Sequence, residues 1–228
     1  MDFSQVQSEP YPWPYNGNWT SQNTALMIID MQTDFCKPGG YCDQMGLDVS
    51  ITGAAIAPTR KVLDAMRQKG FHIIHTREGH RPDLSDLNEN KRWRSQRNGA
   101  EIGTVGVCGR LLTRGEPGWD IVPELAPLPS EPIIDKPGKG SFYATDLEQL
   151  LRRLEIRNLV FTGVTSDCCV HTTMRDANDR GYECLLLSDC SAALDPFNHH
   201  NILEITKKSH GQYGTVASSH ELLAALHE

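Results

Sequence analysis

Long hydrophobic runs are absent from this chain, and none approaches the roughly 20 apolar residues of a membrane span. The N-terminal stretch MDFSQVQSEPYPWPYNGNW is polar and proline-rich and has no apolar core of the kind found in signal peptides. Basic residues are also in deficit, because 22 Lys and Arg stand against 29 Asp and Glu, for a net charge of −7. We therefore expect a cytoplasmic protein with a small-molecule substrate, and no nucleic acid or membrane partner.

Several common cofactor motifs are missing as well. No GxGxxG follows the first apolar run, and GKGS at 138–141 lacks the upstream glycine of a phosphate-binding loop. His199 and His200 are adjacent and would point apart on a helix, so they do not predict a metal site. The seven cysteines are scattered and odd in number, which disfavours disulfides in a reducing compartment. We expect neither a metal nor a cofactor.

What the chain does contain is a regular alternation of apolar runs and amphipathic stretches. Strands are predicted at 24–30, 71–78, 132–136, 158–164, 183–189 and 214–219, and helices at 54–68, 145–156, after Asp167, near 196–208 and at the C-terminus. This pattern predicts one α/β domain over 1–228, with a parallel sheet covered by helices on both faces and an N-terminal arm at 1–23.

One long segment breaks the alternation. Residues 79–131 show little periodicity, and a stretch of this length is typical of a functional cover. Its basic run KRWRSQR, at 91–97, is interpreted as a subunit contact, a solvated face or an anion clamp.

Ligands of open α/β sheets bind at the carboxyl ends of the strands. Asp30 closes the first strand, Lys136 closes the third, and the vicinal pair Cys168 and Cys169 follows the fourth. A thiol in the first turn of a helix, capped by Ser166 or Asp167, is expected to have a lowered pKa, and the free N–H groups there can hold an oxyanion. These residues form a nucleophile, a base and a cation.

Each of these residues also has a structural interpretation. The cysteines also fit small buried hydrophobic residues, Asp30 also fits a cap of the turn MQTDF, and Lys136 also fits an exposed lysine at a strand end. Helical spacing does not decide which of the two cysteines reacts.

The chain resembles the cysteine hydrolase superfamily, the isochorismatase-like amidohydrolases. ALMIIDMQTDF carries the family aspartate, IIDKPGKGSF the lysine, and GVTSDCCV matches the pattern G-[IV]-x-[TS]-x-x-C-V. The resemblance selects Cys169 as the nucleophile, with Cys168 as a packing residue. It further implies the strand order 3-2-1-4-5-6 and a cis peptide between Val164 and Thr165. The N–H groups of Thr165 and Cys169 would form the oxyanion hole, and the family's usual assembly is an oligomer, often a tetramer, with 79–131 reaching across the interface.

The stretch HTREGHRPDL lacks the D-x-H metal motif of nicotinamidases. The segments YPWPYNG, MQTDFCKPGGY, NKRWRSQR and LTRGEPGWDI instead look like the biuret hydrolase and triuret hydrolase group. In KKSHGQYG, Ser209 stands where that resemblance implies a glutamine, and the shorter side chain favours the longer substrate. Phe35, Arg77 and Ser209 are the predicted substrate contacts, although Arg77 also fits a structural ion pair and Phe35 a core position.

The resemblance implies a hydrolase of linear carbonyl ureas that converts triuret and water into carboxybiuret and ammonia, after which carboxybiuret loses carbon dioxide to give biuret. Asp30 would deprotonate Cys169 beside Lys136. Biuret hydrolysis is the first alternative, followed by ureidoacrylate or N-carbamoyl amide hydrolysis. A non-catalytic binding module and a redox role for Cys168 and Cys169 are hypotheses from other classes.

Overall fold

The fold is known from a computed structural model that describes residues 3–227. Its centre is a six-stranded sheet in the order β5-β2-β1-β6-β7-β8, and all neighbouring strands are parallel. The strands are β1 (Thr24–Ile29), β2 (His72–Glu78), β5 (Ile133–Lys136), β6 (Asn158–Val164), β7 (Glu183–Ala192) and β8 (Thr215–Ala217). Numbered by chain order, this is the predicted arrangement 3-2-1-4-5-6, which is confirmed.

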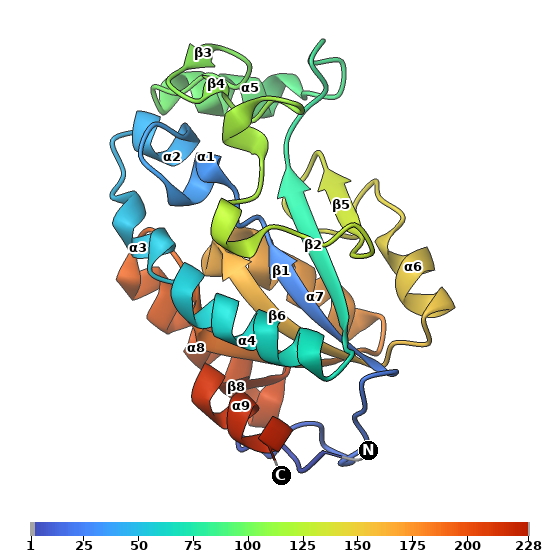
Figure 1. The fold of residues 1–228 in the computed structure, drawn as a ribbon. Coiled ribbons are helices and arrows are strands. Elements are labelled where there is room, and N and C mark those ends of the chain that lie inside the picture. The colour runs from blue at the N-terminus through green and yellow to red at the C-terminus, as the bar shows by residue number, and fades with distance from the viewer. Residues whose placement is uncertain (1–2, 228) are drawn as a thin grey trace.

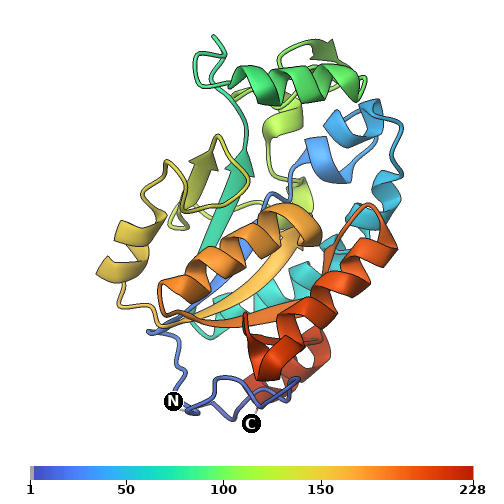
Figure 2. The same cartoon turned by 180° about the vertical axis from the view of Figure 1, so that it is seen from behind.

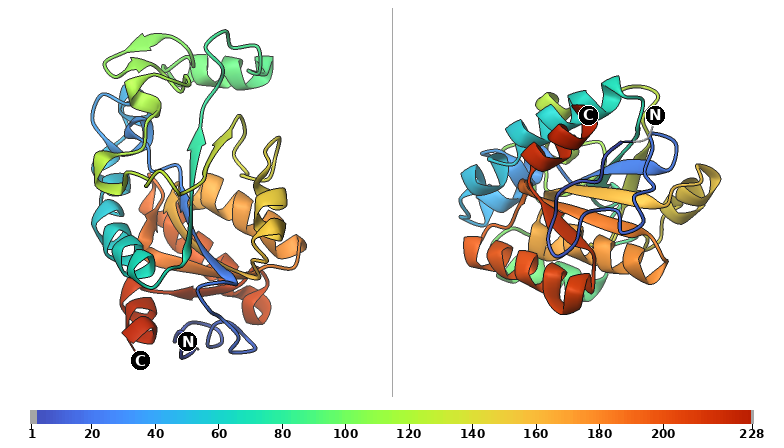
Figure 3. Two further views of the ribbon diagram at one scale, coloured as in Figure 1. Left: turned by 45° about the vertical axis from the view of Figure 1, so that its right-hand side comes forward. Right: turned by 90° about the horizontal axis from the view of Figure 1, so that it is seen from below.

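Helices cover both faces of this sheet, as Figures 1 and 2 show from opposite sides. One face carries α4 (Ile56–Gln68) and α9 (Ser219–His227), and the other carries α6 (Leu147–Arg153), α7 (His171–Asp179) and α8 (Pro196–Gly211). The right-hand view of Figure 3 looks along these layers. The three-layer arrangement follows from the sequence, because a parallel sheet must bury both faces.

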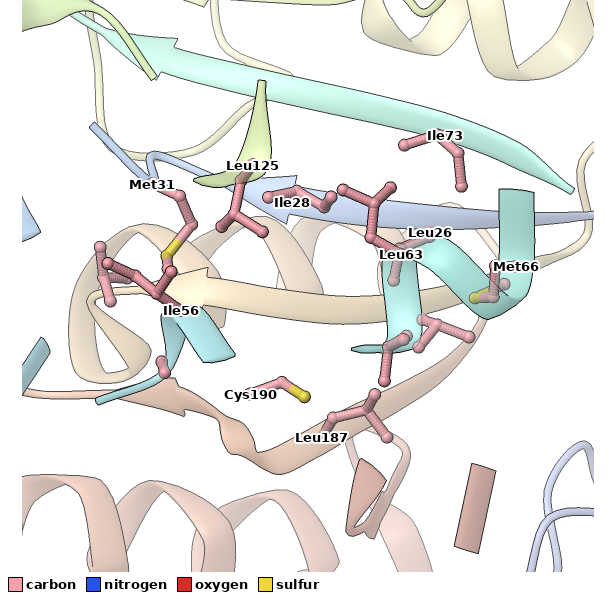
Figure 4. Close-up of a cluster of buried hydrophobic side chains, with 14 of the residues drawn as sticks. Leu26, Ile28, Met31, Ile56, Leu63, Met66, Ile73, Leu125, Leu187 and Cys190 are labelled. Atoms are coloured by element: carbon pink, nitrogen blue, oxygen red, sulfur yellow. The ribbon is translucent and has the colours of Figure 1, made fainter. Parts of the chain in front are cut away.

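Side chains of the central strand alternate between two hydrophobic clusters. Leu26 and Ile28 of β1 belong to the cluster under α4 and α9, shown in Figure 4, whereas Met27 and Ile29 belong to the cluster under α6 and α7. Every residue of β1 and β6 is buried. Period-two alternation on a strand with two covered faces explains why these strands appear as continuous apolar runs.

A group of short elements lies over the carboxyl ends of the strands, at the top of Figure 1, and we call residues 79–115 the cap. The cap contains α5 (Glu89–Arg97) and a small hairpin of β3 (Val105–Gly106) and β4 (Gly109–Arg110). Beside it lie α1 (Thr33–Cys36), α2 (Tyr41–Gln44) and α3 (Val49–Gly53), with the 3₁₀ turns η1 (Pro117–Trp119) and η2 (Pro123–Leu125) below. The basic run at 91–97 therefore forms most of a helix, although its polarity gave no helical pattern.

The arm before the sheet is tied to the domain at the end opposite the cap. Trp13 and Trp19 are buried, and an isolated antiparallel bridge joins Glu9 to Val216 of β8. Phe3 and Trp19 also pack against Phe71, with ring centroids 5.2 and 5.6 Å from that of Phe71. The aromatic residues of this polar, proline-rich stretch thus anchor it to the body of the protein.

Candidate active site

Asp30 follows β1 and lies at the base of the site, fully buried. Its backbone is left-handed, with φ of 49°, a conformation that aspartate tolerates better than most residues. The Thr76 hydroxyl donates to Asp30 Oδ1 at 2.6 Å, and Lys136 Nζ lies 2.7 Å from Asp30 Oδ2. Burial raises the pKa of Asp30 above its ordinary value, while the Lys136 cation opposes the rise. A buried carboxylate with a raised pKa is suited to accept and return a proton.

Lys136 closes β5 and is also fully buried. Its ammonium donates to the carbonyl oxygens of Gly138 at 2.9 Å and Lys139 at 2.8 Å, in addition to pairing with Asp30. Two of the three N–H donors of the ammonium are thus committed to the loop after β5. Burial opposes the charge of Lys136, but Asp30 and the Cys169 thiolate raise its pKa further. Lys136 is therefore a fixed cation and not a proton donor.

Glu78 is a site residue that the sequence analysis missed. It closes β2, is buried, and accepts from Cys169 Sγ at 3.2 Å through Oε2. Lys91 Nζ lies 2.6 Å from Oε1, and Lys136 Nζ lies 3.6 Å from Oε2. Burial alone would raise the pKa of Glu78, but Lys136 and Lys91 outweigh it and lower the pKa to about 2. The strand-end argument used for Asp30 and Lys136 applies equally to Glu78 and was the available signal.

Cys169 lies in η3 (Ser166–Val170), a single turn of π-helix between β6 and α7. Hydrogen bonding with Cys168 and burial raise the pKa of the Cys169 thiol well above its ordinary value, although Lys136 opposes this. The expectation of a lowered pKa is therefore wrong for Cys169, because the hydrogen bond with Cys168 and burial outweigh the helix N-terminus, whereas the same hydrogen bond lowers the pKa of Cys168. The thiol needs a general base.

The turn that carries Cys169 is held differently from the expected helix cap. Its N-cap residue is Thr165, which makes no side-chain capping bond, and the peptide between Val164 and Thr165 is cis, as the resemblance implied. Ser166 Oγ instead bonds His199 Nδ1 at 2.9 Å, and Asp167 accepts from Asn198 at 3.2 Å. Because His199 Nε2 faces the Ser188 carbonyl at 3.1 Å, its Nδ1 is the acceptor for Ser166. Side chains of α8 thus replace the predicted cap by Ser166 or Asp167.

A cavity of about 320 Å³ lies above Cys169, between the sheet and the cap. Cys168, Cys169, Thr165 and Glu78 line its floor, whereas Asp30 and Lys136 are not among the lining residues. Phe35, one of the expected substrate contacts, is also a lining residue. The expectation that Cys168 only packs is corrected, because its partly exposed side chain lines the cavity. The other walls combine apolar groups with polar side chains of the cap and the β5 loop: Tyr41, Met45, Ile102, Leu112 and Leu194, then Lys91, Arg94, Ser95, Asn98 and Lys139.

Arg77 does not line this cavity, which corrects its predicted role. Its guanidinium pairs with Asp135 at 2.8 Å and Asp120 at 3.3 Å and lies 3.6 Å from the centre of the Trp119 ring. Neighbouring residues of a strand point to opposite faces, so the orientation that brings Glu78 into the site directs Arg77 away. Of the two interpretations of Arg77, the structural ion pair is the one observed.

Ser209 is also outside the cavity, and its predicted role is corrected. It lies exposed in a non-helical turn near the end of α8, with φ of 54°. That turn precedes β8, so it lies at the amino end of a strand whose neighbours are parallel. The site lies at the carboxyl ends, and the length of the sheet separates the two.

The ligand atoms of Asp30, Glu78 and Cys169 lie within 4.8 Å of one another, a grouping that resembles a metal site. However, the Lys136 ammonium already lies 2.7 Å from Asp30 and 3.6 Å from Glu78. Its fixed positive charge repels a metal cation and meets the need of these carboxylates for a counter-charge. The residues present therefore do not fit a metal ion.

Comparison with known proteins places this geometry in context. Residues 24–221 match the family model described as the isochorismatase domain. The chain belongs to the isochorismatase family. A ureidoacrylate amidohydrolase RutB of Stutzerimonas stutzeri is 34% identical over 202 residues, which cover 84% of this chain and 77% of that protein. The corresponding protein of Pantoea ananatis is 33% identical over 78% of this chain and 72% of its own length.

Two solved structures are similar to this one in fold. A cysteine hydrolase from Pseudomonas syringae pv. phaseolicola superimposes with a TM-score of 0.79 at 25% identity, covering 100% of this chain and 99% of that one. N-carbamoylsarcosine amidase from Thermoplasma acidophilum has a TM-score of 0.66 at 24% identity over 86% and 96% of the two chains, a likeness of fold. The expected enzyme class, a hydrolase of C–N amide bonds, agrees with the amidohydrolase relatives. These relatives are ureidoacrylate amidohydrolases, so the nearer resemblance to biuret and triuret hydrolases stays a prediction.

None of the helices within residues 3–227 is long and apolar enough to cross a membrane.

Proposed function

We propose that this chain is a cysteine-dependent amidohydrolase that cleaves the terminal carbamoyl group of a ureido acid such as ureidoacrylate. The observation that carries the proposal is the Cys169 thiol on the floor of a cavity, with Asp30 and Lys136 beneath it and cationic side chains on the facing wall. The amidohydrolase relatives support the reaction class.

The acylation step gives Asp30 the role of general base, and its carboxylate lies within 4.8 Å of Cys169 Sγ. Asp30 takes the thiol proton of Cys169, and the resulting thiolate attacks the terminal carbamoyl carbon. The N–H groups of Thr165 and Cys169 receive the oxyanion, in the role that the resemblance implied. Asp30 then returns the proton to the nitrogen as the carbon–nitrogen bond breaks, and ammonia leaves. Lys136, 2.7 Å from Asp30, stabilises the ionised form of Asp30 before this transfer and again after it.

Deacylation consumes one water. Asp30 removes a proton from the water that attacks the thioester, the carbon–sulfur bond breaks, and the thiol of Cys169 is restored. The product is an N-carboxy compound, which loses carbon dioxide. One water is consumed for each ammonia released, and no redox partner is needed.

The preference for an anionic substrate rests on the charge of the cavity wall. Lys91, Arg94 and Lys139 line the cavity, although the chain as a whole carries a net charge of −7. Lys91 is neutralised by Glu78 at 2.6 Å, whereas Arg94 of α5 and Lys139, in the loop after β5, add two further cations to the lining of the cavity. A carboxylate at the far end of a ureido substrate would be favoured by these two cations. Through Arg94, part of the basic run at 91–97 would then act as the anion clamp that was one of its three interpretations.

Linear carbonyl ureas are the second candidate. Ser95 and Asn98 also line the cavity, and their polar side chains can bond the amide and carbonyl groups of triuret or biuret. The particular argument for triuret rested on Ser209, which lies at the other end of the sheet. The proposal that triuret or biuret is the substrate is therefore supported only by the sequence resemblance and by these polar residues of the cavity wall.

The test is the initial rate of ammonia release from ureidoacrylate, biuret, triuret and an N-carbamoyl amino acid, each at several concentrations. We expect the highest kcat/KM with ureidoacrylate, and Arg94→Ala to raise KM for ureidoacrylate about tenfold while biuret is little affected. A higher kcat/KM for triuret or biuret would instead support the linear ureas. Ser209→Ala is the matched control and should leave all four rates unchanged.

Activity on none of these compounds would favour the binding-module hypothesis. The redox hypothesis predicts reversible, oxidant-dependent behaviour that survives Cys169→Ser. Assembly into a tetramer stays a prediction, which sedimentation equilibrium of the purified protein would test. A cytoplasmic location likewise stays a prediction.

A further inference from the structure

Glu78 stands apart from the other charged groups around the nucleophile because it is the carboxylate that meets the cavity. Among the residues of the described chain that line the cavity, it is the only acidic one. Asp30, by contrast, is fully buried beneath the thiol and does not reach the lining. A substrate above Cys169 therefore contacts Glu78 before it contacts any other carboxylate.

The orientation of this carboxylate is fixed from one side. Lys91 Nζ binds Glu78 Oε1 at 2.6 Å and also donates to the carbonyl oxygen of Pro137 at 3.0 Å. Oε1 is thereby committed to the cap, and Oε2 faces Cys169 Sγ at 3.2 Å. A carboxylate oxygen can accept two hydrogen bonds. Oε2 accepts one from the Cys169 thiol and can accept one more from another donor.

Loss of the thiol proton changes the environment of Glu78 Oε2. Once Asp30 has taken that proton, a thiolate and a carboxylate oxygen face each other at the 3.2 Å separation seen for the thiol. Both are buried, so their repulsion is poorly screened, and Oε2 has lost a donor. Lys136 is 3.6 Å from Oε2, but its ammonium donates to the carbonyl oxygens of Gly138 and Lys139 and forms its closer ion pair with Asp30, at 2.7 Å. A new donor must therefore come from the substrate.

A terminal carbamoyl group provides such a donor at the right place. When Cys169 attacks its carbonyl carbon, the attached NH₂ is two bonds from the sulfur and so within reach of Glu78 Oε2, which lies 3.2 Å from that sulfur. An ester of the same shape would place an oxygen lone pair against the carboxylate instead. Sites built to bond a substrate N–H reject analogues that lack it far more strongly than apolar pockets reject a change in size.

We propose that Glu78 selects substrates by the N–H groups on the scissile carbonyl: its Oε2 accepts from the Cys169 thiol in the free enzyme and from the substrate NH₂ once the thiol has lost its proton. This inference rests on the proposed function for the reaction and adds the requirement that the cleaved group be an amide with free N–H. The low pKa of Glu78, about 2, keeps it an acceptor at neutral pH.

The experiment compares Glu78→Gln with the wild-type enzyme on ureidoacrylate and on its methyl carbamate counterpart, in which the terminal NH₂ is replaced by OCH₃. The intrinsic reactivities of the two compounds are the same for both enzyme forms, so the change in the ratio of kcat/KM values is the readout. We expect Glu78→Gln to lower kcat/KM about 10- to 100-fold for ureidoacrylate and less than about threefold for the carbamate ester. Glu78→Asp, which keeps the charge, should recover part of the ratio.

Glu89→Gln is the matched control. Glu89 is an exposed carboxylate in the first turn of α5, the cap helix that also carries Lys91, and it lies outside the cavity lining. It should leave both rate constants unchanged. If Glu78→Gln lowers kcat/KM by the same factor for the amide and for the ester, their ratio is unchanged and the proposal is overturned. Glu78 is then only an ion-pair partner of Lys91.

A second measurement does not depend on the substrate. The rates at which iodoacetamide and methyl iodoacetate alkylate Cys169 are measured by mass spectrometry, which separates Cys169 from Cys168 by fragmentation. A preference of the wild type for the amide reagent that Glu78→Asp retains and Glu78→Gln loses supports the proposal. If the wild type shows no preference for the amide reagent, the proposal is overturned. This outcome can be read even if Glu78→Gln does not fold. If the wild type cleaves no ureido compound yet shows the alkylation preference, the proposed function fails and the inference about Glu78 stands.

Discussion

Lys136 Nζ lies 2.7 Å from Asp30 Oδ2, and neither side chain is exposed to solvent. The two residues come from β5 and from the end of β1, which are separated in the sheet by β2. Removing both charges from water is costly, and the pair is stable only because Thr76 and two carbonyl oxygens satisfy the remaining polar atoms. The ion pair therefore ties the proposed general base to the framework of the sheet.

Replacing Lys136 by methionine should destabilise the protein by about 3–5 kcal/mol, because Asp30 is then a buried carboxylate without a counter-charge. The double variant Asp30→Asn with Lys136→Met removes both charges and should recover much of that loss. Urea denaturation of the three proteins measures the free energies of unfolding. A cost below about 1 kcal/mol for the single variant would show that the buried pair is not required for stability.

Replacing Cys169 by serine should lower kcat for ammonia release by roughly 10³-fold or more, since the hydroxyl is a far weaker nucleophile in the same place. Cys168→Ala removes a thiol that lines the cavity but does not attack, and its effect should stay below about tenfold. Steady-state kinetics of both variants checks this assignment. The reverse order of the two losses would exchange the roles of the cysteines.

Gly163 allows β6 to approach β1 closely, one residue before the Val164–Thr165 peptide. A Cβ atom at Gly163 would lie against the carbonyl oxygen of Ile29, and its φ of 105° is unfavourable for any other residue. Gly163→Ala should therefore cost more than about 3 kcal/mol of stability.

Gly181→Ala is the matched control, because Gly181 also has a positive φ, of 84°, but has nothing within 4 Å of its Cβ position. It should cost only about 1 kcal/mol. Thermal unfolding of both variants separates the steric clash from the backbone preference. Similar costs for the two would contradict the close approach of the strands.

His171 predicts a loss of stability in mild acid. Burial, with Arg175 donating to Nδ1 at 3.1 Å, lowers the pKa of His171 from 6.5 to about 4. In the window between these values the unfolded chain binds a proton that the folded protein does not. The contribution of neutral His171 to the free energy of unfolding is therefore complete above pH 6.5 and falls as the pH drops towards 4. It amounts to about 3 kcal/mol.

The measurement is the free energy of unfolding by urea at several values between pH 4 and 7. His171→Gln should flatten this part of the curve, whereas replacing the exposed His200 by glutamine should leave it unchanged. An equally steep curve for His171→Gln would assign the acid sensitivity to other groups, such as His75, His80 and His199, whose pKa values burial also lowers.

The corrections share a physical origin. Arg77 and Glu78 are adjacent on β2, and only the direction in which the strand faces decides that Glu78 enters the site. The resemblance of a short stretch predicts Ser209 in the site, but the parallel sheet places that stretch at the end opposite the site. The pKa of the Cys169 thiol depends on how deeply it is buried and which carboxylates approach it. None of these is a local property of the chain.

The sequence by itself determined the framework of the site. Six apolar runs separated by helical stretches specify a doubly covered parallel sheet, because such strands must bury both faces. The same topology gathers the residues at the strand ends and predicts Asp30, Lys136 and the pair Cys168 and Cys169 there. The resemblance to the family then selects Cys169. Only the tertiary structure decided the rest: that Glu78 faces the thiol, that α5 brings Lys91 and Arg94 over it, and that Arg77 and Ser209 stay away. Those facts depend on contacts between segments far apart in the chain, which periodicity does not encode.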